Sequence, residues 1–594
     1  MTAEPESSSR LPPIDRHFWL VALLSTVVLL ARAAMIMSAH TEIMDSQFHL
    51  RSGLALLTGN PGEIRDPAND APLGQVLMAL PMVLTGNTPD KPISPATWAS
   101  GVPVPGEAAA GEAPLSPKRA KLARTIRRPV MYGNAMRPET ILLVVGLWKS
   151  LLFVPAVIIA FQWCRAVYGT ASGWLASALL LFDPTIAAHV PIIALDTLGV
   201  EGILIACFCV WRYFERPGTG SLVVAGVAMA VGVLLKHTAV ILPAVAGLFA
   251  LYYWGLRPWR DGTSWPAWRA ALRDRLNAVL LAALVFCFAI WALTGFDLSP
   301  PSAQYAGAVG RTTSASRIGD AVMAALDRPL PAGVYVGRFV SGLLTSGGGH
   351  WAYLWGEARK NGWWYYFPVV ATYKVPIGFG IVILLSLASL AWVRPRRGEV
   401  SMLIPLVAWG ALLLGTHLNI GFRHFLPAHV FVLMLASRCV AGAIRWPAIV
   451  AWVGVALGVV HGFAYHPDYL SYINHPRRQW WLHITESNVD WGQAIRQTRR
   501  WLDARPELES RGISFAPRWD RQAVSVKYYL DDRVTLIDRG SPPPRRGLLI
   551  ISPIWVTGVY DEGKNPYAFL HALEPVDTIG HSLLVYDLDR EPKR

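Results

Sequence analysis

The sequence predicts a polytopic α-helical membrane protein with about eleven spans and a small α/β domain at its C-terminal end. Three observations predict this fold class. Hydrophobic residues make up 53% of the 594 residues and charged residues only 16%, against roughly 25% charged residues in a soluble protein. Long apolar runs recur over the first three quarters of the chain and stop near Tyr465. Short arginine-bearing loops alternate with loops that hold the other polar motifs.

Each apolar run is interpreted as a span from its length. The first run, Phe18 to Ala39, lacks a small-residue cleavage site and is too long for the core of a signal peptide, so it is kept as a span. Two pairs of runs, around Pro191 and Lys236, can each also be one long kinked helix. The spans are predicted to begin near Phe18, Glu139, Gly169, Pro191, Ser221, Thr238, Asn277, Pro368, Ser401, Pro427 and Ala448.

The loops between the runs predict the orientation. With the N-terminus in the cytoplasm, every even-numbered loop faces the cytoplasm, and each of these loops is short and basic, as the positive-inside rule requires. The odd-numbered loops then face outward and hold Glu42, Asp45, Asp196, Lys236 and Arg423. The net charge of +14 therefore reflects topology, and no nucleic-acid partner is expected. We expect the active face and the C-terminal domain to be extracytoplasmic.

Residues 1–464 are expected to form the membrane domain, which includes two long outer loops. The first loop, residues 39–138, contains an interfacial helix from Leu73 to Leu84, because this apolar piece is too short to span a bilayer. The second loop comprises residues 296–367 and is rich in Gly, Trp and Tyr.

Two further segments of the first loop have a biased composition. Asn87 to Pro117 is rich in Pro, Ala and Gly, which predicts a flexible chain. Lys118 to Arg128 is basic and is interpreted as a solvated linker, with binding of anionic lipid or substrate phosphate as the alternative.

Residues 465–594 are expected to form the soluble extracytoplasmic α/β domain. A polar helix is predicted from Trp491 to Ala504, with Asn488 or Asp490 as its cap. Strands are predicted over Val524–Leu530, Gly547–Ser552 and Ser582–Tyr586, because these runs are bounded by turn residues and rich in β-branched and aromatic side chains.

Two carboxylates follow the first span directly. Glu42 and Asp45 are three residues apart and share one face if the helix continues. Taken alone, such charges often only end a span at the interface. Asp196 lies at the outer start of the fourth predicted span, where an ionisable group is a functional candidate. The alternative for Asp196 is a buried acid paired with a basic neighbour.

Four cationic or ionisable side chains lie in the outward-facing loops or at the outer ends of spans. Arg423 carries a planar fork that suits a phosphate group. Lys236 can bind phosphate or extend to the interface, and His424 can be a satisfied buried histidine. Lys374, at the predicted start of the eighth span, is a further candidate, next to the aromatic residues Trp363 to Tyr366, which stack on sugar or isoprenoid or form an interfacial belt.

Three segments carry a resemblance to a known family. They are "DPTIAAHVPIIALD" (Asp183–Asp196), "NIGFRHFLP" (Asn419–Pro427) and "YLSYINHPRRQWWLHITESNVDWGQ" (Tyr469–Gln493). In this order they resemble the GT-C superfamily of integral-membrane glycosyltransferases, and within it the protein-mannosyltransferase-like family of bacterial enzymes that use a polyprenyl-phosphate sugar donor. The chain departs from the family pattern at Asp45-Ser46, where relatives usually have Asp-Glu, and at Ala71-Pro72-Leu73, where they often have His-Pro-Pro-Leu.

The resemblance implies an inverting glycosyltransferase in a bacterial inner membrane. It places the catalytic aspartate at Asp45, the candidate general base, with Glu42 as its partner. Asp196 is expected to position the acceptor, bind a metal or act as a second carboxylate. The donor phosphate is expected to contact Lys236, Arg423, His424 and Lys374. No residues are assigned to a metal site, because no ligand cluster is evident; a divalent metal stays open as a cofactor. The expected partners are the bilayer, the lipid-phosphate sugar that serves as co-substrate, and an extracytoplasmic hydroxyl acceptor on a protein, lipid or envelope glycan.

Two alternatives come from other classes of protein. A transporter or flippase of a lipid-linked or anionic substrate predicts ionisable residues near mid-span and internally repeated, broken helices. The charged motifs of this chain instead cluster at one end of the predicted spans. A non-catalytic membrane scaffold, in which the soluble domain binds a partner, has no need of Asp45.

Overall fold

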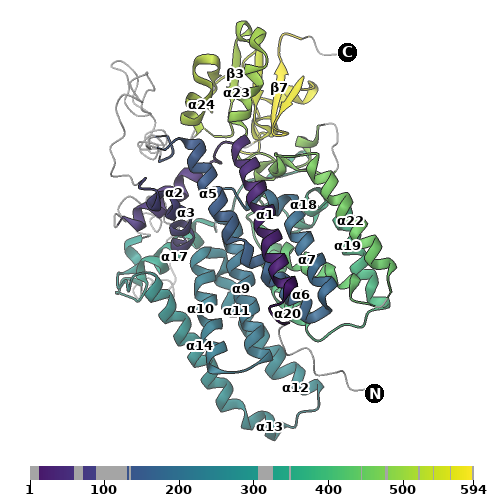
Figure 1. Ribbon diagram of the computed structural model, residues 1–594. Coiled ribbons are helices and arrows are strands. Elements are labelled where there is room, and N and C mark those ends of the chain that lie inside the picture. Colours follow the sequence, from purple (N-terminus) through teal and green to yellow (C-terminus); the bar gives the residue numbers. More distant parts are fainter. Residues whose placement is uncertain are drawn as a thin grey trace.

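Helices make up most of the chain, and a small β-sheet covers one end of them (Figure 1). The computed structural model describes residues 12–58, 71–87, 130–132, 136–304, 326–346, 349–442, 444–474, 479–519, 522–539, 541–561 and 563–590. The segment Lys118–Arg128, and all of the predicted flexible segment except Asn87, lie outside the described residues.

Six helices among the described residues are long and apolar enough to cross a membrane. They are Arg16–Ala39 (α1), Pro138–Tyr168 (α5, Pro138–Leu152, and α6, Val154–Tyr168), Asp196–Glu215 (α9), His237–Arg260 (including α11, Leu242–Ala250, and α12, Arg257–Arg260), Trp265–Leu293 (α13, Trp265–Ala270, and α14, Leu272–Leu293) and Trp446–Phe463 (α22). Shorter apolar helices are α3 (Pro72–Leu84), α7 (Thr170–Phe182), α10 (Thr219–Leu235), α20 (Glu399–Leu414) and α21 (Leu426–Ala436, extended by a 3₁₀ turn to Val440). The protein is therefore a multi-pass membrane protein.

Each predicted span start lies near the start of a helix, and the largest offsets are five residues, from Pro191 to Asp196 and from Asn277 to Leu272. The prediction for the eighth span needs correction. α18 (Tyr366–Lys374) and α19 (Ile377–Ala388) are bent by 120° at a short break that contains Pro376. Proline cannot donate a backbone hydrogen bond, so it favours such a break. Lys374 therefore ends a short helix and does not begin a span.

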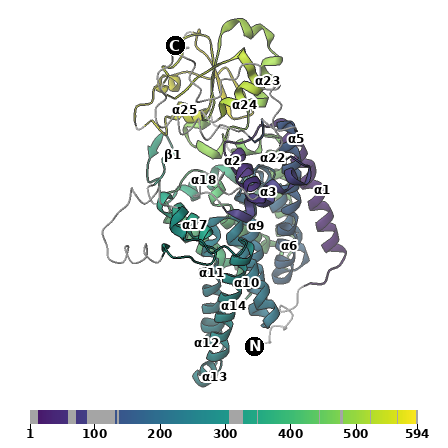
Figure 2. The same cartoon turned by 90° about the vertical axis from the view of Figure 1, so that its left-hand side faces the viewer.

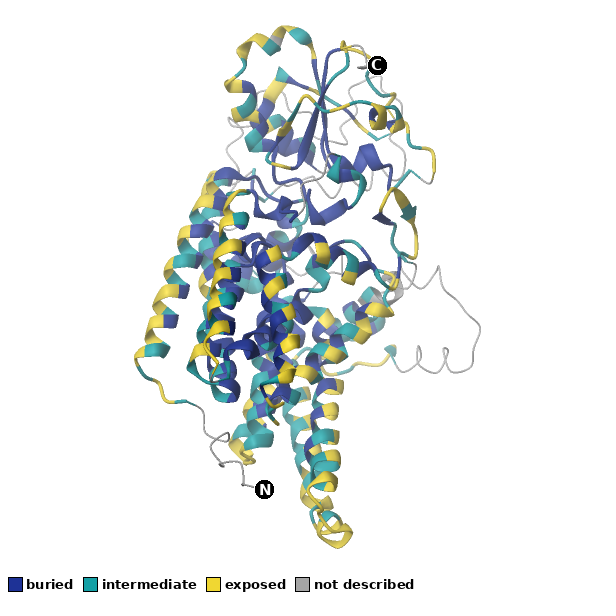
Figure 3. Cartoon of the chain, turned by 90° about the vertical axis from the view of Figure 1, so that its right-hand side faces the viewer, coloured by how far each residue is buried: buried dark blue, intermediate teal, exposed yellow. Residues whose placement is uncertain are grey.

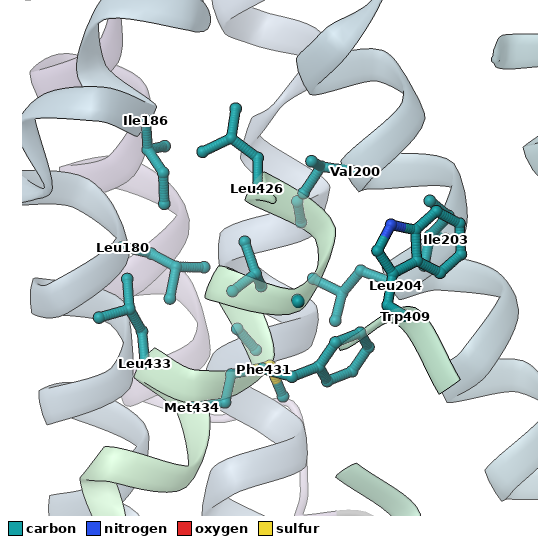
Figure 4. Close-up of a cluster of buried hydrophobic side chains, with 14 of the residues drawn as sticks. Leu180, Ile186, Val200, Ile203, Leu204, Trp409, Leu426, Phe431, Leu433 and Met434 are labelled. Atoms are coloured by element: carbon teal, nitrogen blue, oxygen red, sulfur yellow. The ribbon is translucent and has the colours of Figure 1, made fainter. Parts of the chain in front are cut away.

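The centre of the helical part is a packed apolar core (Figure 4). α21 contributes Leu426, Phe431 and Met434, which meet Leu180 of α7 and Leu204 of α9. Lipid tails are as apolar as leucine, so this packing rests on van der Waals contact and not on transfer out of water.

Large apolar side chains are exposed on the outer helices, whereas the buried residues gather inside (Figure 3). On α14, only Ala289 is buried, and Leu280, Leu284 and Phe288 are exposed. Exposed apolar surface of this extent is expected where a protein meets lipid. The hairpin formed by α12 and α13 lies at the far end of the molecule from the C-terminal sheet (Figure 2).

Short elements surround the end of the helices that lies toward the C-terminal sheet (Figure 1). They are α2 (Ser46–Leu57), α8 (Pro184–His189), α17 (Gly333–Ser346) and the hairpin of β1 (Ala352–Leu354) and β2 (Glu357–Arg359). The predicted helix from Leu73 to Leu84 is α3. α1 ends at Ala39, where the first predicted span ends, and His40 is extended, so the helix does not continue to Glu42. Glu42 and Asp45 therefore lie in a loop and do not share a helix face.

The C-terminal residues form a five-stranded mixed sheet in the order β4-β3-β5-β7-β6. The strands are β3 (Ile513–Ala516), β4 (Thr535–Leu536), β5 (Leu548–Ile551), β6 (Asp577–Ile579) and β7 (Leu583–Asp587). β3 pairs in parallel with β4 and β5, and the other pairs are antiparallel. Alternate side chains of β5 point to opposite faces: Leu548 and Ile550 pack with one apolar cluster and Leu549 and Ile551 with another.

The sheet confirms the predicted strands Gly547–Ser552 and Ser582–Tyr586 within one or two residues at each end. The segment Val524–Leu530 is not a strand but helix α24 (Ala523–Leu530), which packs beside α23 (Ile495–Asp503). The predicted polar helix begins at Ile495 instead of Trp491, and neither Asn488 nor Asp490 caps it. A last short helix, α25, covers Pro553–Thr557.

Candidate active site

Asp196 lies at the centre of a buried group of charges. It is the first residue of α9, and its side chain is 5% exposed. Lys236 Nζ is 2.5 Å from Asp196 Oδ1, and an Arg423 terminal nitrogen is 3.7 Å from Asp196 Oδ2. The structure thus brings together three residues predicted from separate motifs. Two cations and one anion leave this triad with one net positive charge.

Close helix packing places Lys236 against Asp196. α9 and α10 approach through Gly202 and Gly232, since a Cβ atom on Gly202 would lie 2.8 Å from the Cα atom of Gly232. Lys236 follows the end of α10 and lies over Gly199, where a Cβ atom would be 2.6 Å from the lysine Cδ. The lysine therefore crosses the first turn of α9 and reaches the carboxylate that begins this helix.

Arg423 is held from two sides. Its guanidinium carbon lies 4.0 Å from the ring centre of Trp491. The amide of Phe422 donates a 2.8 Å hydrogen bond to Asn488 Oδ1, which fixes the adjacent 3₁₀ turn (Phe422–His424). Arg423 Nε is buried and has no acceptor among the described residues. The guanidinium is therefore positioned while part of its donor set stays unused.

The turn before Asp196 is anchored by residues that the sequence analysis missed or did not weigh. Lys149 on α5 is buried and donates to the carbonyl of Ile192 and, at 2.8 Å, to that of Ala194. Ser46 donates to the carbonyl of Ile193 at 3.4 Å. A lysine in the apolar run of α5 was a signal that could have identified Lys149.

Asp45 precedes α2 and is partly exposed, and its side chain makes no capping hydrogen bond. It forms no ion pair with any residue in the part of the chain that is described. The amide of Met44, one residue earlier, donates to the carbonyl of Trp491 at 3.2 Å. The Asp45 loop and the Arg423 side chain therefore both contact Trp491.

His49 connects Asp45 and Asp196 electrostatically. Burial lowers the pKa of His49 to about 4, while the carboxylates of Asp45 and then Asp196 oppose this shift. Lys149 and Arg423 reinforce the decrease. The pKa of one imidazole is thus influenced by both carboxylates and by a cation of the triad.

Glu42 faces the C-terminal part of the chain. Its buried carboxyl group accepts hydrogen bonds from Tyr132 at 2.5 Å, from Ser525 on α24, and from Gln47 at 3.5 Å. Burial raises the pKa of this carboxyl group above its ordinary value. No contact among the described residues joins Glu42 to Asp45, so its predicted partnership with Asp45 stays a prediction.

Lys374 and His424 differ in what their polar atoms contact. The buried Lys374 ammonium donates to the carbonyls of Leu470, Tyr472 and Asn488 at 3.0, 2.8 and 2.7 Å, which uses all three of its protons. Its contacts therefore hold a loop together. Nε2 of His424 is buried and has no described partner. Burial, followed by Arg423 and Lys236, lowers the pKa of His424 well below its usual range, so the ring is neutral.

No group of three or more His, Cys, Asp or Glu side chains that could hold a metal ion occurs within the described ranges. His189, seven residues before Asp196, hydrogen-bonds the Thr185 carbonyl through Nδ1 at 2.8 Å. The geometry assigns no metal ligands here.

Comparisons with solved structures give distant matches. ArnT from Cupriavidus metallidurans, bound to undecaprenyl phosphate, is 12% identical and matches over 96% of this chain and 97% of its own, with a TM-score of 0.33. The oligosaccharyltransferase of Archaeoglobus fulgidus in its apo form is 11% identical over 93% of this chain and 72% of its own, with a TM-score of 0.44. Scores of this size do not by themselves define a common fold. The comparison with curated proteins gives no match.

One protein-family model matches the chain. Residues 141–291, from α5 to the end of α14, match the family described as dolichyl-phosphate-mannose-protein mannosyltransferase. This segment contains Asp196 and Lys236 of the charged triad. The match agrees with the resemblance predicted from the sequence: over these residues, the chain is similar to this family of mannosyltransferases.

Proposed function

We propose that the protein is an inverting glycosyltransferase. It moves a sugar, a hexose or a pentose, from a polyprenyl-phosphate donor to a hydroxyl group of an extracytoplasmic acceptor on a protein, lipid or envelope glycan. The observation that carries this proposal is the buried triad of Asp196, Lys236 and Arg423, which keeps one net positive charge and a guanidinium nitrogen that has no acceptor among the described residues.

The cations of the triad are suited to the leaving group. When the bond between the anomeric carbon and the phosphate oxygen breaks, the electron pair stays on the lipid phosphate. Donors that are already in place stabilise this growing charge without reorganisation. Lys236 supplies a point charge, and Arg423 supplies a planar fork stacked on Trp491. Asp196 keeps both cations apart and oriented, since it is bonded to one and faces the other.

Asp45 is suited to the base. The acceptor oxygen attacks the anomeric carbon from the side opposite the phosphate, and its proton passes to a carboxylate as the new bond forms. Asp45 is partly exposed and forms no ion pair with a described residue, so its carboxylate is available for this proton. His424 adds a neutral imidazole beside Arg423, and Glu42 supports the loop that carries Asp45.

The same arrangement supports the proposed topology, in which residues 1–464 form the membrane domain and residues 465–594 the outer domain of a bacterial inner-membrane protein. Trp491, near the C-terminal sheet, contacts Arg423. The start of α1 and the arginine-bearing hairpin of α12 and α13 lie at the opposite end (Figure 1). These positions support placing the proposed site and the outer domain on one side of the bilayer. The charged triad lies at the ends of its helices, which favours the transferase over a transporter.

The test is replacement of Asp45 by Asn in a strain that lacks the native chain. Mass spectrometry of its envelope glycans and glycoproteins identifies the sugar that is missing and the molecule that carried it. The wild type and the control D261N, which changes an exposed carboxylate at the opposite end, are expected to restore this sugar. D45N is expected to reach the membrane at the same level and to restore none. Restoration by D45N would exclude Asp45 as the base, and a strain with no glycan change would count against the transferase itself.

A further inference from the structure

Two buried ring nitrogens beside the proposed site have no hydrogen-bond partner among the described residues. They are Nε2 of His189 and Nε1 of Trp491. The centres of the two rings are 6.0 Å apart, and the ring planes are tilted by 45°. His429 is equally buried, but its Nε2 lies 2.8 Å from Asp183. A buried polar atom without a partner costs about 1–3 kcal/mol, so two neighbouring rings that each carry such an atom suggest a ligand group.

The hydrogen bond that His189 does make determines where its proton lies. Nδ1 is 2.8 Å from the carbonyl oxygen of Thr185. A carbonyl only accepts, so Nδ1 carries the hydrogen and Nε2 is an acceptor in the neutral ring. Burial lowers the pKa of His189 to about 4, with Asp196 opposing and Lys374 and Arg423 reinforcing the shift. The ring therefore stays neutral at pH 7, and Nε2 keeps its lone pair.

The two unused atoms are complementary in chemistry. The indole Nε1 of Trp491 can only donate, and Nε2 of His189 can only accept, whereas a hydroxyl group does both. We propose that His189 and Trp491 together bind a hydroxyl group of the substrate, carried either by the transferred sugar or by the acceptor. This inference rests on the proposed function.

The position of the pair agrees with this assignment. The Trp491 ring lies under the Arg423 guanidinium, the proposed phosphate contact, at 4.0 Å. The Trp491 carbonyl accepts from the amide of Met44, the neighbour of Asp45. A hydroxyl bound at this ring therefore lies close to the group assigned to the leaving phosphate and on the residue that contacts the loop of the proposed base.

Three variants separate the hydrogen bonds from the packing. H189N keeps a donor near Nδ1 for the Thr185 carbonyl but removes the acceptor at Nε2. H189Q restores an acceptor oxygen near the position of Nε2. W491F removes the indole N–H and keeps an aromatic ring under Arg423. H571N is the matched control, because His571 is an exposed histidine of the C-terminal part whose Nε2 bonds the Val556 carbonyl.

The readout is transfer of radiolabelled sugar from polyprenyl-phosphate mannose into envelope material, in membranes of the complemented strain. H189N and W491F are expected to slow transfer roughly 5- to 150-fold, the range of one lost buried hydrogen bond. H189Q is expected to recover part of the rate, and H571N to match the wild type. Thermal unfolding of the purified variants checks that they fold.

Equilibrium binding of polyprenyl-phosphate mannose and of sugar-free polyprenyl phosphate then locates the hydroxyl. Weaker binding of the sugar-loaded lipid alone assigns it to the donor sugar. Unchanged binding of both lipids, with slower transfer, assigns it to the acceptor. Wild-type transfer by folded H189N and W491F would overturn the inference, as would equal loss in H189N and H189Q. Failure of the wild type to transfer mannose would exclude mannose as the sugar, and failure with every polyprenyl-phosphate hexose and pentose would instead refute the proposed function.

Discussion

Replacing Arg423 tests the proposed phosphate contact most directly. In R423A, Asp196 keeps its 2.5 Å contact with Lys236, so no charge of the triad is left buried and unpaired. The net charge of the triad falls from one positive charge to zero. The variant therefore removes a phosphate ligand with limited damage to the fold.

The expected size of the effect follows from the contacts of Arg423. A hydrogen bond to a charged group contributes about 1.5–3 kcal/mol, so R423A should bind lipid phosphate roughly 10- to 150-fold more weakly. R423K keeps the positive charge but loses the planar stack on Trp491, which lies at 4.0 Å. That stack is worth about 0.5–2 kcal/mol, so R423K should bind roughly 2- to 30-fold more weakly.

The assay is equilibrium binding of a radiolabelled short-chain polyprenyl phosphate to detergent-purified protein. R397A is the matched control, because Arg397 pairs with Asp261 on the opposite end and its side chain is 59% exposed. The wild type and R397A are expected to bind with equal affinity, R423K more weakly, and R423A most weakly. If folded R423A binds as tightly as R397A, Arg423 is not a phosphate ligand and the reasoning from the triad fails.

Two further predictions concern residues at the edge of the site. K374M should lower the free energy of unfolding by about 3 kcal/mol or more, because three buried carbonyls lose their donor. The folded fraction should still bind polyprenyl phosphate with wild-type affinity. A large loss of affinity would instead show that Lys374 contacts the phosphate. The raised pKa of Glu42 means that this carboxyl group holds its proton more tightly in the folded protein than in the unfolded chain. The protonated group should therefore contribute fully to the free energy of unfolding below about pH 4.5, the ordinary pKa of glutamate. This contribution should be lost as the pH rises through the raised pKa. E42Q should flatten this part of the curve of melting temperature against pH, and an unchanged curve would contradict the assignment.

The helices and the charged triad were largely predictable from the sequence. Apolar length locates a span to within a turn or so, because lipid thickness sets the requirement. Asp196, Lys236 and Arg423 were selected because each is ionisable and lies near the outer end of an apolar run, and the structure joins them by contact. Because the polar motifs are predicted to lie on one side of the membrane, the candidate site residues are limited to those near that surface.

Contacts between distant segments were not predictable in this way. Val524, Val526 and Tyr529 favour a strand by intrinsic preference. The buried residues Val526, Tyr529 and Leu530 also have the spacing of one helix face, and packing against α23 selects the helix. Trp491 was expected to lie in a helix of the outer domain. Trp491 contacts Arg423 because the chain folds back onto the helices after the last predicted span. No local sequence pattern predicts the position of this returning segment.

The loop that carries Asp45 depends on a segment made much later. Thr41 donates to the carbonyl of Gln493 across 452 residues of chain, and Met44 donates to that of Trp491. At synthesis rates of roughly 5–20 residues per second, about 20 to 90 s separate the two segments on the ribosome. The first span and its carboxylates would enter the membrane well before Trp491 exists. The nascent protein would therefore meet lipid-linked sugars without a complete site, and activity would begin only after the final quarter of the chain has docked.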